Sequence, residues 1–393
     1  MLMIAERGAA PYNHCTIPSH EKHNKMFVRR HAFALYCTLL LLSAVLLAEF
    51  VLLPRLFGMP RDLLLLGFNA KPNEVIDGQR INTMGFTGDV ISQQKSSNTV
   101  RVLILGSSTM FNRHMAEQMK AALQKSLPNK NIELLDAGIR SHTTRADVIK
   151  LQYLKHYAWD FVLIYNGIND LWANHVRPQD FYADYRHTDP WHRRSFLLDH
   201  SLIARHIYNN SYTYIRVLNT KMSEAFFPIY QFVFPKKPYI NAADFASQNS
   251  FSDNINTLID ISQQIGAKPV LLTFAYHLPA NYSRQAFLNQ QLDYRNPDNY
   301  DSRDVYNWGP PTYVREGLDK ENTALREIAA QRKIALIDID QQMSNHGAWF
   351  GDVCHFNNEG VAQFTARVAQ HLAAQAAPAT ATTAEQSAAN PSQ

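Results

Sequence analysis

The sequence predicts an α/β protein in which a doubly wound sheet of five parallel strands lies between two layers of helices, preceded by one transmembrane helix. Between residues 100 and 375, short and continuously apolar runs alternate with longer amphipathic segments. This alternation is typical of a parallel sheet covered on both faces. Near the N-terminus, residues 32–53 form an apolar run long enough to cross a bilayer. The rhythm of the strands favours a three-layer, flavodoxin-like order.

The N-terminal apolar run is expected to be a signal anchor. Its only charged side chain is Glu49, close to its C-terminal end. At about 1.5 Å per residue, a helix over this run spans roughly 33 Å, against about 30 Å for the hydrocarbon core of a bilayer. The flanking basic residues are Lys22, Lys25, Arg29 and Arg30 before the run, and Arg55 and Arg61 after it. This bias predicts a cytoplasmic N-terminus and an extracytoplasmic remainder.

A cleaved signal peptide is the alternative interpretation of the same run. Its apolar core would be about 7–15 residues long and would be followed by a small-residue cleavage site. Residues 32–53 exceed that length, and no clear Ala-x-Ala site follows them. The anchor is therefore the preferred interpretation.

Composition excludes several other classes of protein. The chain has 393 residues and a formal net charge of +4, without a block of Lys or Arg, so nothing predicts a nucleic-acid partner. The three cysteines, Cys15, Cys37 and Cys354, form no zinc-binding pattern. In the predicted topology only Cys354 is exported, so we expect no intramolecular disulfide there. No metal or organic cofactor is expected.

Each strand and helix of the sheet region follows from its local pattern. Strands are predicted where Val, Leu, Ile and Phe run together: residues 100–105, 131–136, 160–165, 268–274 and 334–339. Amphipathic helices are predicted between and after them: residues 111–126, 144–157, 251–265, 313–331 and 358–375. The crossovers between parallel strands should be right-handed.

The remaining segments complete the predicted domain organisation. A polar cytoplasmic arm (1–31) precedes the anchor (32–53), and a connecting segment (54–99) leads to the main domain (100–375). Two stretches within that domain, about 171–250 and 279–312, are long for simple connections and are predicted to be insertions. The tail (376–393) is rich in Ala, Thr, Ser and Pro and is predicted to be disordered.

Chemistry-bearing residues gather where the predicted strands end. Ser107 and Ser108 follow the first strand, and Asp352 and His355 follow the fifth. Ligands of doubly wound sheets bind at the carboxyl ends of the strands. A serine hydroxyl becomes nucleophilic when a histidine takes its proton, and a carboxylate can orient that histidine. These residue types are those that acyl transfer requires.

Four short blocks resemble the SGNH (GDSL-type) hydrolases, which are serine esterases and acylhydrolases on a flavodoxin-like sheet. In chain order, the blocks are Gly106-Ser107-Ser108, Gly138, Gly167-Ile168-Asn169-Asp170 and Asp352-Val353-Cys354-His355. The first resembles the family's GDSxT, the third its GxND and the last its DxxH. The blocks keep the family's order over residues 100–375. Residues 81–89 also resemble a segment that often precedes the first block in membrane-anchored members of the family.

The resemblance implies a role for each matched residue. Ser108 would be the nucleophile, His355 the general base and Asp352 the residue that orients it. The backbone N–H groups of Ser108 and Gly138 and the amide of Asn169 would form the oxyanion hole. Ser107 departs from the family pattern because it occupies the position of the family's aspartate.

Plainer interpretations exist for each of these residues taken alone. Ser108 could cap a helix, and Asn169 could be a turn residue. Asp170 is expected to be structural, and Cys354 to serve packing. Three further polar residues near strand ends are tentative substrate-binding candidates: Arg140, His142 and His277.

The sequence therefore predicts an extracytoplasmic, membrane-anchored serine esterase or acylhydrolase. The location favours esters, including O-acetyl groups, of cell-envelope carbohydrate or lipid. An acyltransferase of the same type and a non-catalytic scaffold for envelope polymer assembly are the alternatives. The sequence leaves the oligomeric state open.

Overall fold

The structure is a computed structural model, and it describes residues 20–57, 72–76, 78–111, 114–185, 187, 201–204, 245–296 and 302–376. Most of the predicted arm, nearly all of the tail, and the greater part of the insertion at about 171–250 lie outside these residues. The chain divides into two compact units, one up to Leu52 and one from Leu53 onward, and each is described by itself.

The N-terminal unit contains one long apolar helix. Helix α1 (His20–Leu47) runs into a π-helical turn, η1 (Ala48–Leu52), which ends this unit, and the second unit begins with α2 (Leu53–Phe57). Residues 29–56 are long and apolar enough to cross a membrane. Large side chains along it are exposed, among them Phe33, Leu41 and Phe50. An exposed apolar surface of this kind suits a lipid environment better than water.

The second unit is built on a six-stranded sheet in the order β3-β5-β4-β6-β7-β8. Its strands are β3 (Thr87–Gly88), β4 (Thr99–Gly106), β5 (Asn131–Asp136), β6 (Phe161–Tyr165), β7 (Lys268–Leu272) and β8 (Ala335–Ile337). The last five pair in parallel, in the flavodoxin-like order. The predicted five-stranded parallel sheet is confirmed.

The sixth strand is a feature that the sequence analysis missed. β3 pairs antiparallel with β5, Thr87 opposite Asp136, and it comes from the predicted connecting segment 54–99. A separate hairpin of β1 (Val75–Ile76) and β2 (Gln79–Arg80) precedes it. Strands of two residues carry too little periodicity to be recognised in a sequence.

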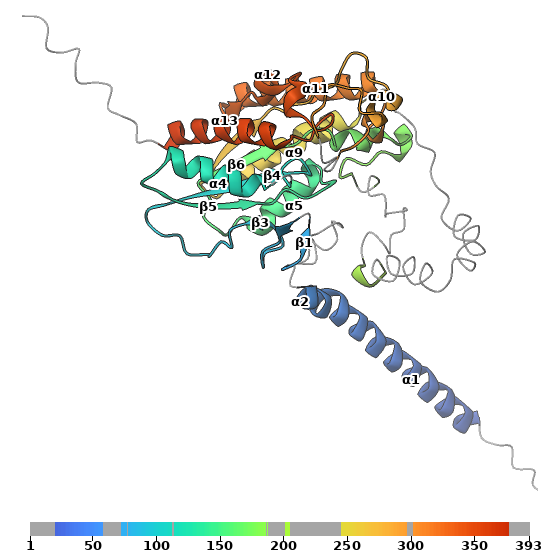
Figure 1. Ribbon diagram of the computed structural model, residues 1–393. Helices are drawn as coiled ribbons and strands as arrows, with labels where there is room; N and C mark the ends of the chain where they lie inside the picture. The colour runs from blue at the N-terminus through green and yellow to red at the C-terminus, as the bar shows by residue number, and fades with distance from the viewer. Residues whose placement is uncertain are drawn as a thin grey trace, which may run out of the picture. The chain divides into compact units, whose positions relative to one another are not determined.

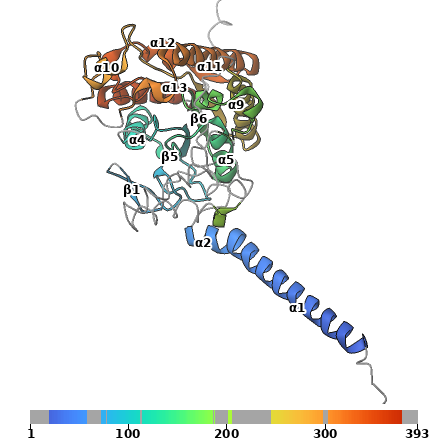
Figure 2. The ribbon, with the colours of Figure 1, turned by 90° about the vertical axis from the view of Figure 1, so that its right-hand side faces the viewer.

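Helices cover both faces of the sheet (Figure 1). Their bounds are α4 (Met115–Ser126), α5 (Thr144–Leu154), α9 (Ser247–Gln264), α10 (Arg284–Leu288), α11 (Pro311–Arg332), α12 (Ile339–Met343) and α13 (Asn358–Ala376). Short 3₁₀ turns are η2 (Asp170–Asn174), η3 (Pro178–Asp180), η4 (Val305–Asn307) and η5 (Gly347–Trp349). Figure 2 shows α4 and α5 on opposite sides of β5.

The alternation of side chains along β4 shows why its sequence is apolar throughout. Val102 and Ile104 belong to a core shared with α4 and α13, whereas Leu103 and Leu105 belong to a core shared with α5 and α9. Both faces of a central parallel strand are buried, so both sets of side chains must be apolar. The two cores fix β4, and they thereby fix the turn that follows it.

Candidate active site

The turn after β4 places Ser108 at the carboxyl-terminal end of the parallel strands. Gly106 ends the strand, and a Cβ there would lie 2.7 Å from Met110 Cγ and 2.8 Å from the Tyr165 carbonyl oxygen. The backbone N–H groups of Met110 and Phe111 both donate to the Ser107 carbonyl, at 3.1 and 3.2 Å. Within this tight turn Ser107 is buried and Ser108 is half-buried. The turn therefore exposes the second serine.

A chain of hydrogen bonds joins Ser108 to His355 and Asp352. The Ser108 Oγ lies 2.9 Å from His355 Nε2. The opposite ring nitrogen, Nδ1, lies 2.8 Å from Asp352 Oδ2. Because Nδ1 faces a carboxylate, it carries the proton of the neutral ring and leaves the Nε2 lone pair toward the serine. This is the arrangement that a histidine needs to accept the proton of a serine hydroxyl.

The Asp352 carboxylate is held by the backbone around it. Its Oδ1 accepts from the N–H groups of Cys354 (2.9 Å) and His355 (2.8 Å). Its Oδ2 also accepts from the Arg303 N–H at 2.6 Å. Asp352 is fully buried and His355 nearly so, so the pair has little freedom to rotate. The buried Cys354 thiol lies 3.6 Å from His355 Nδ1, the ring nitrogen that faces Asp352. The thiol is therefore not at Nε2, the ring nitrogen that contacts Ser108.

The amide of Asn169 is oriented by two contacts. Its Nδ2 donates to the His142 carbonyl at 3.0 Å, and its Oδ1 accepts from Trp308 Nε1 at 3.0 Å. An amide nitrogen carries two hydrogens, so one N–H remains after the bond to His142. Asn169 lines the same cavity as Ser108 and His355, of about 260 Å³. The Trp308 bond determines which end of the amide is its donor.

Gly138 occupies a different place from the one expected of an oxyanion donor. Its N–H donates to Asp136 Oδ1 at 2.8 Å. A Cβ at Gly138 would lie 2.6 Å from Met110 Cβ and 3.0 Å from the Ser107 carbonyl oxygen, so the residue packs beneath the serine turn. The expectation for Gly138 therefore needs correction, because its donor is already used inside the protein.

Ser141 lies where Gly138 was expected. It lines the cavity together with Ser108 and Asn169. Its backbone is left-handed, with φ +64°, a conformation that non-glycine residues adopt rarely. Within the described part of the chain, the backbone N–H of Ser141 has no acceptor. A serine with positive φ gives no signal in a sequence, whereas a glycine does.

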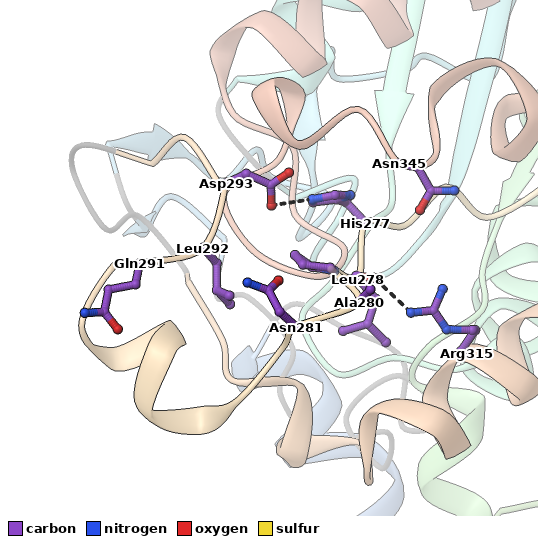
Figure 3. Close-up of a pocket in the computed structure, with 10 residues that line it drawn as sticks. His277, Leu278, Ala280, Asn281, Gln291, Leu292, Asp293, Arg315 and Asn345 are labelled. Carbon is purple, nitrogen blue, oxygen red and sulfur yellow. Dashed lines mark hydrogen bonds and ion pairs between the residues drawn. The ribbon is translucent and has the colours of Figure 1, made fainter.

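The three tentative substrate-binding residues have different surroundings in the structure. Arg140 lines the Ser108 cavity. The His142 side chain is buried and is not part of that lining; its contribution is the carbonyl that holds Asn169. His277 lines a second cavity, of about 470 Å³, and none of the described residues lines both cavities. Figure 3 shows it there, with Nε2 bonded to Asp293 Oδ1 at 2.8 Å.

Several residues of the Ser108 cavity were not predicted from the sequence. They are Ser141, Trp172, Arg303, Asn307 and Trp308. Each comes from an irregular loop or a short 3₁₀ turn. No periodic pattern marks such segments, and only the fold brings them to the strand ends.

A buried ion pair lies beneath the loops that follow β4, β5 and β6. Lys150 Nζ donates to the carbonyls of Gly106 (3.1 Å) and Ala137 (2.6 Å), and it pairs with Asp147. The Asn166 amide also donates to Asp147. Lys150 and Asp147 are fully buried, and burial raises the pKa of Asp147 despite the lysine. The ends of β4, β5 and β6 are thus tied to one pair of charges.

Two further aspartates under the site titrate unusually. Burial raises the pKa of Asp136 to about 7, although the Gly138 N–H and the charge of Lys150 oppose the shift. Burial likewise raises the pKa of Asp170 to about 7. Asp170 accepts from the backbone N–H and, at 2.6 Å, from the hydroxyl of Thr144, so it anchors the start of α5. Its place is structural, as its position after Asn169 suggested.

Comparison with known proteins gives one family. A model of the GDSL-like Lipase/Acylhydrolase family matches residues 96–363, about two thirds of the chain. No curated protein matches the sequence.

Solved structures of similar fold come from several bacteria. A lipase/acylhydrolase from Enterococcus faecalis is 12% identical, covers 70% of this chain and 97% of its own, and has a TM-score of 0.36. A GDSL-like lipase from Bacteroides thetaiotaomicron is 12% identical, with coverage of 73% and 93% and a TM-score of 0.38. A catalytic mutant of an acetylxylan esterase from Geobacillus stearothermophilus is 13% identical, with coverage of 71% and 96% and a TM-score of 0.37. The family match, rather than these likenesses, sets the class of the protein.

Proposed function

The chain belongs to the GDSL-like lipase/acylhydrolase family, and from this premise we propose that Ser108, His355 and Asp352 are its catalytic triad. One observation carries the proposal: the continuous chain of hydrogen bonds from Ser108 Oγ through both nitrogens of His355 to Asp352. A serine that only capped a helix would not need a buried imidazole and carboxylate behind it.

The proposed reaction proceeds through an acyl-enzyme. His355 Nε2 takes the Ser108 proton while Oγ attacks the ester carbonyl carbon, and the carbonyl oxygen becomes an oxyanion. When the tetrahedral intermediate collapses, the imidazolium gives its proton to the leaving alcohol oxygen. His355 then takes a proton from an incoming water or sugar hydroxyl while the acceptor oxygen attacks the acyl carbon. When the bond between the acyl carbon and Ser108 Oγ breaks, the imidazolium returns its proton to Oγ. Asp352 stabilises the imidazolium in both steps.

The oxyanion would be held by the Asn169 amide and by the backbone N–H groups of Ser108 and Ser141. Ser141 takes the role first expected of Gly138, because it lines the cavity and Gly138 donates to Asp136. Trp308 is the positioning residue for Asn169. Such donors act mainly when negative charge develops, so they lower the barrier more than they strengthen substrate binding.

The apolar helix supports a membrane-anchored location for this chemistry. We place residues 1–31 in the cytoplasm, the anchor at 32–53, and the catalytic part from residue 100 onward outside the cytoplasm. Esters of cell-envelope carbohydrate or lipid, including O-acetyl groups, are then the substrates within reach. Water as acceptor makes the protein a hydrolase, and a sugar hydroxyl as acceptor makes it a transferase.

Release of acetate from a small acetyl ester tests the triad. The full-length chain in neutral detergent should hydrolyse the ester, and Ser108→Ala and His355→Gln should each lower kcat by about a thousandfold or more. Ser107→Ala is the matched control, since Ser107 is buried in the same turn and its hydroxyl lies 3.4 Å from the Thr109 hydroxyl. It should retain most of the activity.

Two results would count against the proposal. One is activity that survives Ser108→Ala. The other is a folded wild-type chain that neither releases acetate to water nor transfers it to an added sugar acceptor. The second result would favour the scaffold interpretation.

A further inference from the structure

The cavity around His277 and Asp293, which we call the His277 cavity, has no role in the chemistry proposed for Ser108. Its volume is about 470 Å³, within the ~300–1,000 Å³ typical of small-molecule sites. Its walls come from the segments after β7 and α10, from helix α11 and from the loop after α12 (Figure 3). Segments that follow the strands of a doubly wound sheet are those that bind ligands.

One wall of the His277 cavity presents a carboxylate that a buried histidine holds. Asp293 Oδ1 lies 2.8 Å from His277 Nε2. The side chain of Asp293 is 62% exposed and that of His277 only 7%. Because Nε2 faces a carboxylate, it is the ring nitrogen that carries the proton. A carboxylate has about four lone-pair sites, so Asp293 can accept from His277 and from a ligand together.

Neighbouring residues hold this histidine–aspartate pair in place. A Cβ at Gly347 would lie 2.6 Å from Asp293 Oδ2 and 2.8 Å from His277 Nε2, so the pair occupies the space that a side chain there would need. The Tyr294 hydroxyl donates to the His277 carbonyl at 2.7 Å, and its ring meets the imidazole edge to face at 5.3 Å. The carboxylate is therefore oriented before a ligand arrives, which lowers the entropy cost of binding.

The opposite wall presents a cation. Arg315 of α11 is half-buried, and its Nη2 donates to the Leu278 carbonyl at 2.9 Å. Figure 3 shows Arg315 and Asp293 on opposite sides, with Leu278 between them. A guanidinium has five N–H donors in one plane, so Arg315 can hold this carbonyl and a ligand oxygen together. The cavity thus offers a strong acceptor on one side and a strong donor on the other.

Amide and aliphatic side chains also line the cavity. The amides are Asn281, Gln291 and Asn345, all of them exposed. An amide both donates and accepts, as does a hydroxyl. A ring that carries several hydroxyls can therefore pair with the carboxylate, the guanidinium and the amides at once. Its C–H groups can contact Leu278 and Leu292, which lie on the same wall of the cavity as the carboxylate or next to it.

The two charges argue for a ligand without charge of its own. An anion would be repelled by Asp293 and a cation by Arg315. An amino-acid zwitterion carries its two charges close together, whereas Asp293 and Arg315 lie on opposite sides of the cavity (Figure 3). Neutral hydroxyls meet neither difficulty, because each can accept from the arginine or donate to the aspartate.

We propose that the His277 cavity is a binding site for a neutral saccharide, whose hydroxyls are held by Asp293, Arg315 and the three amides. The proposal goes beyond the proposed function, because it needs no ester and no reaction at Ser108. The site is nevertheless joined to the proposed triad. The backbone N–H of His277 donates to the carbonyl of Val353 at 2.9 Å, in the loop that carries Asp352 and His355.

Calorimetric titration of the full-length chain in neutral detergent tests this inference. The probes are neutral trisaccharides of glucose, of mannose, of galactose and of N-acetylglucosamine, without ester groups, so that none of them is turned over. At least one should bind with a Kd in the millimolar range or tighter. Raising the salt concentration should change that Kd by less than about twofold, because salt screens attraction between charges and leaves hydrogen bonds to hydroxyls in place.

Variants of the lining locate the bound saccharide. Asp293→Ala should weaken binding by about tenfold or more, because hydrogen bonds to a charged group are lost. Asn281→Ala removes an exposed amide, a change that the fold should tolerate, and should weaken binding by about threefold. The matched controls are Asp260→Ala, at an exposed carboxylate that pairs with Arg332, and Gln285→Ala, at an exposed amide on α10. Both controls should bind as the wild type does.

Several outcomes would overturn the inference. One is that no trisaccharide binds. Another is binding that survives Asp293→Ala and Asn281→Ala but is lost in Trp172→Ala, which would place the saccharide in the Ser108 cavity. Tighter binding of dialanine or of an oligouronate than of every neutral trisaccharide would reject a neutral ligand. Fluorophosphonate labelling of Ser108 separates the two proposals: labelling without saccharide binding overturns only this inference, and saccharide binding without labelling overturns only the proposed function.

Discussion

The Asn169 amide shows how a residue outside the four sequence blocks controls a residue inside them. Trp308 Nε1 donates to Asn169 Oδ1 at 3.0 Å, which turns the amide nitrogen toward the His142 carbonyl and the cavity. Without that donor, the two ends of the amide would differ less in energy. The donor toward the oxyanion would then be present for only part of the time.

Replacing Trp308 with Phe should therefore lower kcat by about tenfold and change KM little, because the lost hydrogen bond acts through a group that serves the transition state. Steady-state kinetics on a soluble acetyl ester would measure both constants. The matched control is Trp159→Phe, which loses an indole bond of 2.7 Å to the Leu154 carbonyl, away from the site. A fall in kcat of equal size in both variants would show that the effect is structural.

The buried Asp136 carboxyl gives a prediction for stability against pH. Its pKa is raised from 3.8 to about 7 in the folded protein. Between these values the folded chain keeps a proton that the unfolded chain releases, so stability falls as pH rises from about 4 to about 7. The loss attributable to this group is on the order of 4 kcal/mol at most.

Asp136→Asn should flatten this fall, because an amide keeps an acceptor for the Gly138 N–H and has no charge to bury. Urea titrations at pH 5 and pH 8 would give the free energy of unfolding at each pH. The difference should be smaller in the variant by on the order of 2 kcal/mol. Asp260→Asn, at a largely exposed carboxylate, is the control. An unchanged slope in Asp136→Asn would contradict the raised pKa.

The motif residues of the site could be predicted from the sequence, and their neighbours could not. Ser108, Asp352 and His355 stand in recognisable blocks, and the structure brings them into hydrogen-bond contact. The family resemblance assigns Gly138 to the oxyanion hole as the glycine of the second block, whereas the Gly138 N–H donates to Asp136. Ser141 was missed because its positive φ is imposed by the loop. His277 follows a strand end as predicted, yet it faces another cavity (Figure 3).

At the scale of elements, apolar runs located the strands well, and local hydrogen bonds set the ends of the helices. Strand β5 has its predicted bounds, residues 131–136. Helix α4 begins at Met115 instead of residue 111, because the N–H of Phe111 is used in the serine turn and His114 is left-handed. β8 ends before its predicted limit because Asp338 caps the short helix that follows it. Such interactions depend on single side chains, which a periodic pattern does not reveal.

The ion pair beneath the strand ends should be essential as a unit. Lys150→Met leaves the Asp147 charge buried without its partner, and it leaves the carbonyls of Gly106 and Ala137 without their donor. We expect a loss of about 3–5 kcal/mol in the free energy of unfolding. Urea titration would measure it.

The double variant Lys150→Met with Asp147→Leu tests whether the unpaired charge causes the loss. It should be more stable than Lys150→Met alone, since replacing both members of a buried pair costs less than breaking it. A double variant with a lower free energy of unfolding than Lys150→Met alone would show that the unpaired Asp147 charge is not the cause of the loss.

At the scale of the whole molecule, the apolar helix is either a membrane anchor that is kept or a signal peptide that is cleaved, and the two cases can be distinguished by experiment. A signal anchor keeps the full-length chain in the membrane after alkaline carbonate extraction, whereas a cleaved signal releases the catalytic part. We expect the first result, because residues 29–56 are long and apolar enough to cross a bilayer. Protease added outside sealed cells should then digest the part that follows the helix. Protection of that part would contradict the proposed orientation.

Covalent labelling of the nucleophile tests the central claim most directly. A fluorophosphonate reacts only with a serine that a neighbouring base has activated, whatever the natural substrate. Treating the full-length chain and mapping the modified peptide should place the label on Ser108, with labelling lost in Ser108→Ala and retained in Ser107→Ala. A folded wild-type chain that took up no label, or that was labelled equally in Ser108→Ala, would contradict an activated Ser108.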